Sequence, residues 1–395
     1  MKVLFWASTL FVTYAYIGYA GLMWLLARSR PKPVTKGPVR PKVSIVMPVH
    51  NGAAALPGKL KNLSELAYPR DLLEVVVASD GSTDTTADIL SSAPQVKTVL
   101  CPRVGKAEAL NRALAVSSYE IVVFTDVRQQ IEPGAISELV ANFADDNVGC
   151  VSGELMFSPS WTKISGVSAY WKVEKFIRRC ESDSGSVIGA TGAFYAVRRS
   201  LITDLPVGTL LDDVFIPLNV IKQEKRVIFE PEARVWDEMP EDTSSEFKRK
   251  VRTLAGNIQM LQLTPWVITD GSVRFRFVSH KLTRLLAPWL LLAVFFSAWS
   301  LAGSAFYLAV ALLQSGFYGL AIATLVMPSL FQGRVVSVAR AFCVMNTAAA
   351  VAVFSYVRHR RDLRQIWTTS NCSSDYEEQP QSVAKVGQIV TANRE

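Results

Sequence analysis

The sequence predicts an α/β domain with a central, mostly parallel sheet, joined to helices that cross a membrane. Apolar residues gather in one block at the start of the chain and in a longer block after Lys281. Between these blocks, short buried strands alternate with helices, which is the pattern of a parallel sheet. Of the 395 residues, 50% are apolar and only 19% are charged, a low charged fraction for a soluble protein of this length.

The first apolar block, residues 3–27, is long enough to cross a bilayer at about 1.5 Å per residue. A cleaved signal peptide is the alternative, but its apolar core normally has about 7–15 residues. Arg28 and Arg30 follow the block directly, so we favour a retained anchor. Basic residues beside a span mark the cytoplasmic side, which places the next domain in the cytoplasm at the inner or plasma membrane.

The net charge of +8 raises the alternative of a nucleic-acid binder. Much of the basic charge, however, flanks the apolar blocks, where it suits anionic lipid. We therefore expect a lipid bilayer as partner and no nucleic acid. The five cysteines and three histidines show none of the spacings that are typical of a disulfide framework or a metal knuckle.

Three buried strands of the middle region end in polar residues. Ligands of open α/β sheets bind beyond the carboxyl ends of the strands, so these residues mark a candidate site. A helix is expected before Leu66, another from Thr83 with Ser82 or Thr83 as its cap, and a third over residues 106–116. The expected strands are 43–47, ending at Pro48 and followed by His50 and Asn51; 73–78, ending at Asp80; 96–100; and 121–124, ending at Asp126.

The second apolar block reads as about three spans, over residues 285–303, 305–327 and 335–356. Three spans after a cytoplasmic domain would place the basic cluster from Arg358 to Arg364 outside, against the positive-inside tendency. One apolar segment lying in the interface would remove this conflict. The predicted boundaries are an anchor (1–28), a basic Pro-rich linker (29–42), the α/β domain (43–265), an interfacial segment (266–284), membrane helices (285–357) and a basic juxtamembrane segment with a polar tail (358–395).

Each acid at the sheet edge has a functional and a structural interpretation. Asp80 stands in a tight turn, where its carboxylate accepts hydrogen bonds from ribose or base, or else caps the next helix. Asp126 offers the hard oxygen that a divalent ion on a diphosphate requires, or else caps a turn. Arg128, two residues on, points the same way along an extended chain and is suited to phosphate.

Lys106 opens a helix after Arg103 and Gly105, and a basic group beside the free N–H groups of a helix start favours a phosphate. Asp212 and Asp213 are adjacent, and neighbouring carboxylates push each other's pKa apart, which suits a general base. Solvated loops and helix caps are the structural alternatives.

Arg249 and Arg252 share one face of a predicted helix. Such a face is suited to clamp a leaving diphosphate. A solvated or membrane-surface basic face is the alternative.

Taken in order, three segments resemble family 2 glycosyltransferases, the inverting group that includes cellulose, hyaluronan and chitin synthases. They are Ser-Ile-Val-Met-Pro-Val-His-Asn leading to Ala-Ser-Asp-Gly-Ser-Thr-Asp, Gly-Lys-Ala-Glu-Ala-Leu-Asn leading to Phe-Thr-Asp, and Gly-Ala-Thr-Gly-Ala-Phe-Tyr-Ala-Val-Arg-Arg leading to Leu-Asp-Asp-Val. The resemblance covers residues 43–264, and the apolar blocks fit the membrane-bound branch of the family.

This resemblance implies a GT-A-type nucleotide-sugar transferase domain and a nucleotide-diphosphate sugar as donor, most often a UDP-sugar. It implies that Asp80 meets the nucleoside, Asp126 the metal-bound diphosphate, with Mg²⁺ or Mn²⁺ as cofactor, and Lys106 the nucleotide. Asp213 is then the catalytic base beside Asp212, and Gly192 lies near the acceptor. The residues expected to bind the nucleotide-sugar are Pro48, His50, Asn51, Asp80, Lys106, Asp126, Arg128, Arg249 and Arg252.

Two departures from the family pattern stand out. The metal motif Asp-x-Asp reads Asp126-Val127-Arg128, so one acid is replaced by a cation. The motif Gln-x-x-Arg-Trp, which accompanies processive synthesis, reads Arg249-x-x-Arg252-Thr253. We therefore expect transfer of one or a few sugars to a lipid or glycan acceptor. The alternatives are a polysaccharide synthase that also exports its polymer, and a non-catalytic membrane scaffold.

Overall fold

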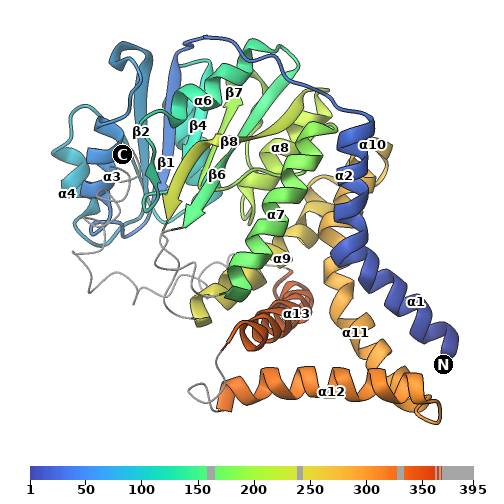
Figure 1. The fold of residues 1–395 in the computed structure, drawn as a ribbon. Coiled ribbons are helices and arrows are strands. Elements are labelled where there is room, and N and C mark those ends of the chain that lie inside the picture. Colours follow the sequence, from blue (N-terminus) through green and yellow to red (C-terminus); the bar gives the residue numbers. More distant parts are fainter. Residues whose placement is uncertain (158–164, 238–242, 327–332, 361–362, 364–365, 367–395) are drawn as a thin grey trace. The chain divides into compact units, whose positions relative to one another are not determined.

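The computed structural model describes residues 1–157, 165–237, 243–326, 333–360, 363 and 366 (Figure 1). The chain divides into two compact units, which we describe separately. The helical unit comprises Met1–Arg30, Ser160–Cys180 and Glu241–Arg361, and the sheet unit comprises Pro31–Pro159, Glu181–Pro240 and Asp362–Glu395. The predicted basic tail lies almost wholly outside the described residues, and the predicted domain boundaries stay predictions.

The sheet unit is built on one eight-stranded mixed sheet with the order β3-β2-β1-β4-β7-β6-β8-β5. Four of its seven strand pairings are parallel and three are antiparallel, which confirms the predicted mostly parallel sheet. The strands are β1 Val43–Val49, β2 Leu73–Asp80, β3 Lys97–Cys101, β4 Ile121–Thr125, β5 Gln130–Ile131, β6 Val148–Phe157, β7 Phe194–Arg198 and β8 Arg226–Asp237.

Strand β1 lies between β2 and β4, parallel to both, and forms the centre of the sheet. Val43, Ile45, Val46 and Met47 have 0% exposure, because helices cover both faces of a parallel sheet and leave no strand face in water. This explains why the predicted strands are continuous apolar runs without alternation. The helices of this unit are α3 Leu56–Ser64, α4 Thr86–Ser91, α5 Lys106–Val116, α6 Ala135–Ala141 and α8 Asp212–Lys222.

The expected start of α4 is wrong. The helix begins at Thr86, and neither Ser82 nor Thr83 caps it. Both are held instead by Asn51, whose backbone N–H donates to Ser82 Oγ (3.1 Å) and whose Oδ1 accepts from the Thr83 N–H (2.8 Å). Asp84 stabilises the turn before the helix instead, because its Oδ1 accepts from the Thr86 N–H at 3.1 Å.

The helical unit contains four helices long and apolar enough to cross a membrane: Lys2–Ser29, Val273–Ser300, Ala305–Thr324 and Val335–His359. Each coincides with a predicted span, but the second starts earlier than expected, because α10, a π-helical turn and α11 follow one another without a break. The helices are α1 Lys2–Thr13, α2 Tyr19–Ser29, α7 Ser165–Asp183, α9 Thr243–Leu263, α10 Gly271–Phe277, α11 Thr283–Ser300, α12 Ala305–Val326 and α13 Arg334–His359.

A buried ion network ties α7 into the helical unit. Glu174 of α7 lies 3.2 Å from His280 Nε2 and forms an ion pair with Arg284 at the start of α11. Burial alone would raise the pKa of Glu174, but Arg284 and the hydrogen-bonded His280 hold it well below its usual range. The ring of Tyr19 lies against that of His280 with centroids 5.5 Å apart, so the N-terminal segment packs against the same network.

Candidate active site

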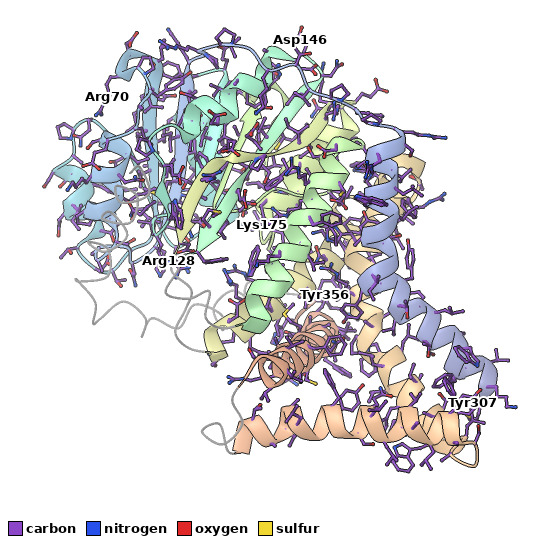
Figure 2. The ribbon with its side chains drawn as sticks, in the orientation of Figure 1. Arg70, Arg128, Asp146, Lys175, Tyr307 and Tyr356 are labelled. Carbon is purple, nitrogen blue, oxygen red and sulfur yellow. The ribbon has the colours of Figure 1, made fainter. Side chains whose placement is uncertain are left out.

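The candidate site forms where β1, β2 and β4 end side by side. Because the three strands run parallel, their carboxyl ends share one edge of the sheet. Figure 2 shows Arg128 at this edge, whereas Asp146, which precedes β6, lies at the opposite edge. His50, Asp80 and Asp126 follow or end these strands, as the sequence predicts.

Asp80 is buried, and the protein itself satisfies its carboxylate. The side chain is 3% exposed. Oδ1 accepts from the backbone N–H groups of Val104 (2.7 Å) and Gly105 (2.9 Å), and Oδ2 forms an ion pair with Arg103. Gly81 follows with φ +60°, and a Cβ there would lie 2.6 Å from the Arg103 backbone nitrogen. Asp80 therefore fixes the loop that leads into α5, and its contact with a nucleoside stays a prediction.

His50 and Asn51 connect the ends of β1 and β2. His50 Nδ1 lies 2.8 Å from the Asp80 carbonyl oxygen, which can only accept, so Nδ1 carries the proton. In the neutral ring, Nε2 is then a hydrogen-bond acceptor. Asn51 has φ +49°, a left-handed conformation that asparagine tolerates better than most residues. Pro48 is the next-to-last residue of β1, one position inside a strand that was expected to end there.

Lys106 links two acids from different elements. Its Nζ lies 3.3 Å from Asp126 Oδ1 after β4 and 3.0 Å from Asp212 Oδ1 at the start of α8. Burial would lower the pKa of Lys106, but the carboxylates of Asp126, Asp212 and Asp213 outweigh it and raise that pKa above its usual value. Lys106 is therefore a fixed positive charge within a cluster of three carboxylates.

Asp212 and Asp213 occupy the first two positions of α8, where the helix N-terminus favours negative charge. Asp212 is 6% exposed, and Tyr195 OH donates to its Oδ2 at 3.3 Å. Lys106 takes its other oxygen, so the protein holds Asp212 from both sides.

Asp213 is half-buried and faces Gly192. A Cβ built on Gly192 would lie 2.8 Å from Asp213 Oδ2, closer than real Cβ contacts. The Asp213 main-chain oxygen accepts from the Ala190 N–H at 2.7 Å, which anchors the start of α8 to the segment before β7. The structure thus brings together the predicted base and the predicted acceptor-side glycine.

Arg128 and Asp126 face different partners. Arg128 Nη2 lies 3.7 Å from Asp237 Oδ2 at the end of β8, and its side chain is 40% exposed. Asp126 faces Lys106 and is 39% exposed. The chain bends at residues 127–128, so the extended conformation that the sequence suggested is not present.

Three further residues of this region escaped the sequence analysis. Tyr195 stacks on Phe124 with ring centroids 4.7 Å apart, and its phenol reaches Asp212 from within a segment that reads as plain apolar strand. Asp237 ends β8, and only the pairing of the strands places it near Arg128. Lys59 lies fully buried on α3 between Leu56 and Leu63, and its place on the apolar face of that helix is the signal that the sequence did contain.

Arg249 and Arg252 lie on α9 of the helical unit, apart from the residues above in the division of the chain. Arg249 forms an ion pair with Glu246, one turn earlier, at 2.5 Å. Lys250 lies over the ring of Trp171 at 5.2 Å, and its side chain is 15% exposed. The role of Arg249 and Arg252 toward a donor stays a prediction.

The residues at this end of the sheet can hold a divalent ion only together with oxygen atoms of a bound substrate. Among the described residues, no group of three or more His, Cys, Asp or Glu side chains is placed to hold a metal. Asp126 offers one half-exposed carboxylate, and Arg128 stands where a second acid would be. Since Mg²⁺ and Mn²⁺ accept oxygens of substrate phosphates beside one or two carboxylates, this donor set fits an ion that arrives with a diphosphate.

Comparisons with known proteins identify the family of this domain. Residues 44–205 match the profile of glycosyl transferase family 2, so the chain carries a family 2 glycosyltransferase domain. A probable glycosyltransferase of Bacillus subtilis, YdaM, is 26% identical over 234 residues. A poly-beta-1,6-N-acetyl-D-glucosamine synthase of Staphylococcus aureus is 23% identical over 229 residues. Each alignment covers 55% of this chain and 55% of the relative, so the chain spans about half the length of these curated relatives.

A solved structure extends the similarity over most of the chain. The mannosyltransferase PcManGT from Pyrobaculum calidifontis, in complex with GDP-Man and Mn2+, is 25% identical with a TM-score of 0.68. The match covers 89% of this chain and 98% of that protein. The fold of the sheet unit is therefore GT-A, as the resemblance implied.

Proposed function

We propose that this protein is an inverting glycosyltransferase that moves a sugar from a nucleotide-diphosphate sugar to a lipid or glycan acceptor at the cytoplasmic face of the membrane. The contact between Asp213 and Gly192 carries this proposal. It places a half-exposed carboxylate at the start of α8, with Lys106, Asp126 and Asp212 assembled beside it.

Asp213 is better suited than Asp212 to act as the base. Asp212 is 6% exposed, and its oxygens are taken by Lys106 and Tyr195. Asp213 is more exposed than Asp212 and lies against a residue with no side chain, so an acceptor hydroxyl can reach it more easily. The absence of a Cβ at Gly192 leaves room for an acceptor hydroxyl.

The reaction is one displacement at the anomeric carbon. Asp213 takes the proton of the acceptor hydroxyl as its oxygen bonds to that carbon. The bond from the carbon to the diphosphate oxygen breaks, and the nucleoside diphosphate leaves with the electron pair. Inversion follows because a single attack occurs from the opposite face. The transition state has the oxocarbenium character known from glycoside hydrolysis.

The leaving diphosphate meets positive charge from Lys106 and Arg128. Mg²⁺ or Mn²⁺, when held by Asp126, neutralises part of the charge that develops there. The Mn2+ in the complex of the similar mannosyltransferase supports this cofactor. Lys106 Nζ lies 3.3 Å from Asp126 Oδ1, so this carboxylate has a positively charged partner even when no ligand is bound.

A donor screen tests the proposal. Detergent-purified protein would be given UDP- and GDP-sugars with Mg²⁺, Mn²⁺ or EDTA and total membrane lipid as acceptor, and release of nucleoside diphosphate would be measured. Release from one donor, lost with EDTA and in Asp213→Asn, is the expected result. Both nucleotides are included because UDP is usual in the family, whereas the similar mannosyltransferase was solved with GDP-Man. No release from any donor contradicts the proposal and favours a scaffold.

A polysaccharide synthase is the second candidate, because one relative is named a poly-beta-1,6-N-acetyl-D-glucosamine synthase. The substitutions at Arg249 and Thr253 argue against processive synthesis. Product length separates the two: a labelled donor yields a single short product from a transferase and a polymer from a synthase.

A further inference from the structure

Lys59 lies beneath the segment that carries Asp126 and Arg128. It belongs to α3, and its side chain is 0% exposed. Its Nζ donates to Thr125 Oγ1 at 3.0 Å and to the main-chain oxygen of Gln129 at 2.6 Å. One buried amine thus contacts the chain on both sides of the residues 126–128.

Asn62, one turn further along α3, holds the same segment at a third point. Its Nδ2 donates to the Ile131 oxygen and its Oδ1 accepts from the Ile131 N–H, both at 2.9 Å. Residues three positions apart lie on one face of a helix, so Lys59 and Asn62 reach this segment from the same side of α3 at separate points. Only Lys59, however, contacts the part of the segment next to Asp126.

The support continues from Gln129 to Arg128. Gln129 Nε2 donates to Asp237 Oδ2 at 2.8 Å, and this same oxygen lies 3.7 Å from Arg128 Nη2. Because Lys59 fixes the backbone of Gln129, it also fixes the side chain through which Asp237 is held beside Arg128.

Stability alone does not favour an amine here. Leu56 and Leu63 flank Lys59 on the buried face of α3, where a nonpolar side chain would pack without desolvating a charge. Burial lowers the pKa of Lys59 to about 7, and the carboxylates of Asp126 and Asp237 partly oppose this shift. A position that is unfavourable for the fold and adjacent to a candidate site points to a role in that site.

We propose that Lys59 is a positioning residue: its amine fixes Thr125 and Gln129, so that Asp126 and Arg128 are presented together to the diphosphate of the donor and its metal ion. This inference rests on the proposed function. It predicts that loss of Lys59 weakens the binding of donor and metal more than it slows the transfer of the bound donor.

Lys59→Met in the full-length protein tests this role. We expect KM for the donor and the Mn²⁺ concentration for half-maximal rate to rise about tenfold, as for other groups that orient a ligand from behind. We expect kcat to change much less. Lys59→Gln keeps an N–H-donating group, the side-chain amide, and should recover part of the lost affinity.

Asn62→Ser is the matched control, because it loosens the same segment at Ile131 without touching Thr125 or Gln129. It should lower the melting temperature with little change in KM. If Lys59→Met lowers only the melting temperature, or changes KM no more than Asn62→Ser does, Lys59 is a structural residue and the inference is wrong.

The failure of the proposed function is a separate outcome. If the wild-type protein transfers no sugar, calorimetric titration with UDP or GDP in the presence of Mn²⁺ decides the inference on the same variants. Weaker nucleotide binding by Lys59→Met than by Asn62→Ser supports it. Equal affinity in the two variants, or no Mn²⁺-dependent binding by the wild type, overturns it.

Discussion

Asp80 and Asp126 both end strands of the same parallel sheet, yet the protein treats their carboxylates in opposite ways. Asp80 is 3% exposed and accepts from two backbone N–H groups and Arg103. The Asp126 side chain is 39% exposed, and Lys106 is its ion-pair partner. The carboxylate at the end of β2 is thus buried and bound by the protein, whereas the one after β4 is accessible to a ligand. We call these the closed side and the open side of the sheet. A strand end predicts where an acid lies, but not whether it is available to a ligand.

The largest effect is expected at Asp213, the proposed base. Asp213→Asn removes the proton acceptor but keeps the shape of the side chain, so it should lower kcat by about 10²–10⁴-fold. Donor KM should change little. Initial rates over a range of donor concentrations give both quantities, and full activity of this variant would show that another group is the base.

Asp126→Ala should have the next largest effect. Loss of the one half-exposed carboxylate beside Lys106 should weaken the apparent affinity for Mn²⁺ and donor by about 10²-fold. The melting temperature should stay close to that of the wild type, because this acid contributes to binding rather than to the fold. Metal titrations of the rate are the measurement, with Asp126→Asn as the isosteric control.

Asp80→Asn should act on the fold, in contrast to Asp126→Asn. It loses the ion pair with Arg103 and one charged acceptor for backbone N–H groups, so we expect about 1.5–3 kcal/mol of destabilisation. Thermal unfolding of both variants in the same detergent makes the comparison. Equal melting temperatures for Asp80→Asn and Asp126→Asn would mean that the two sides of the sheet do not differ as described.

The smallest effect concerns the pH dependence of stability that comes from Lys59, which lies beneath the segment that carries Asp126. The pKa of Lys59 is about 7 in the folded protein and 10.5 when exposed, so between these values the unfolded state binds more protons. Stability that depends on Lys59 should then rise with pH in this window, by at most about 1.4 kcal/mol from pH 7.5 to 8.5. The melting temperature of the wild type relative to that of Lys59→Met should rise accordingly, and a difference independent of pH would contradict the lowered pKa.

The sequence predicted the sheet and its functional edge because both follow from local patterns. Buried strands are continuous apolar runs, and the residues after them must lie where parallel strands end. The prediction for the start of α4 was wrong because of a contact between residues distant in the sequence. Asn51, 31 residues before Ser82, binds the groups that would have capped the helix.

Contacts between distant residues also limit what the sequence predicts about the candidate site. Composition and spacing singled out Asp80 and Asp126, but which of them the protein satisfies depends on the loop at Val104, which meets β2 only in the fold. The pairing of Asp237 with Arg128 depends likewise on where β8 ends. Lys59 is the exception, since a charge on the apolar face of a short helix is visible in the sequence itself.

The contact between Gly192 and Asp213 also limits how this domain can evolve. Every other amino acid at position 192 brings a Cβ to within 2.8 Å of the Asp213 carboxylate. Since that carboxylate ends a side chain that can rotate away, we expect such a change to leave the fold intact and to displace only the proposed base. Variation at position 192 should therefore be limited by activity rather than by stability.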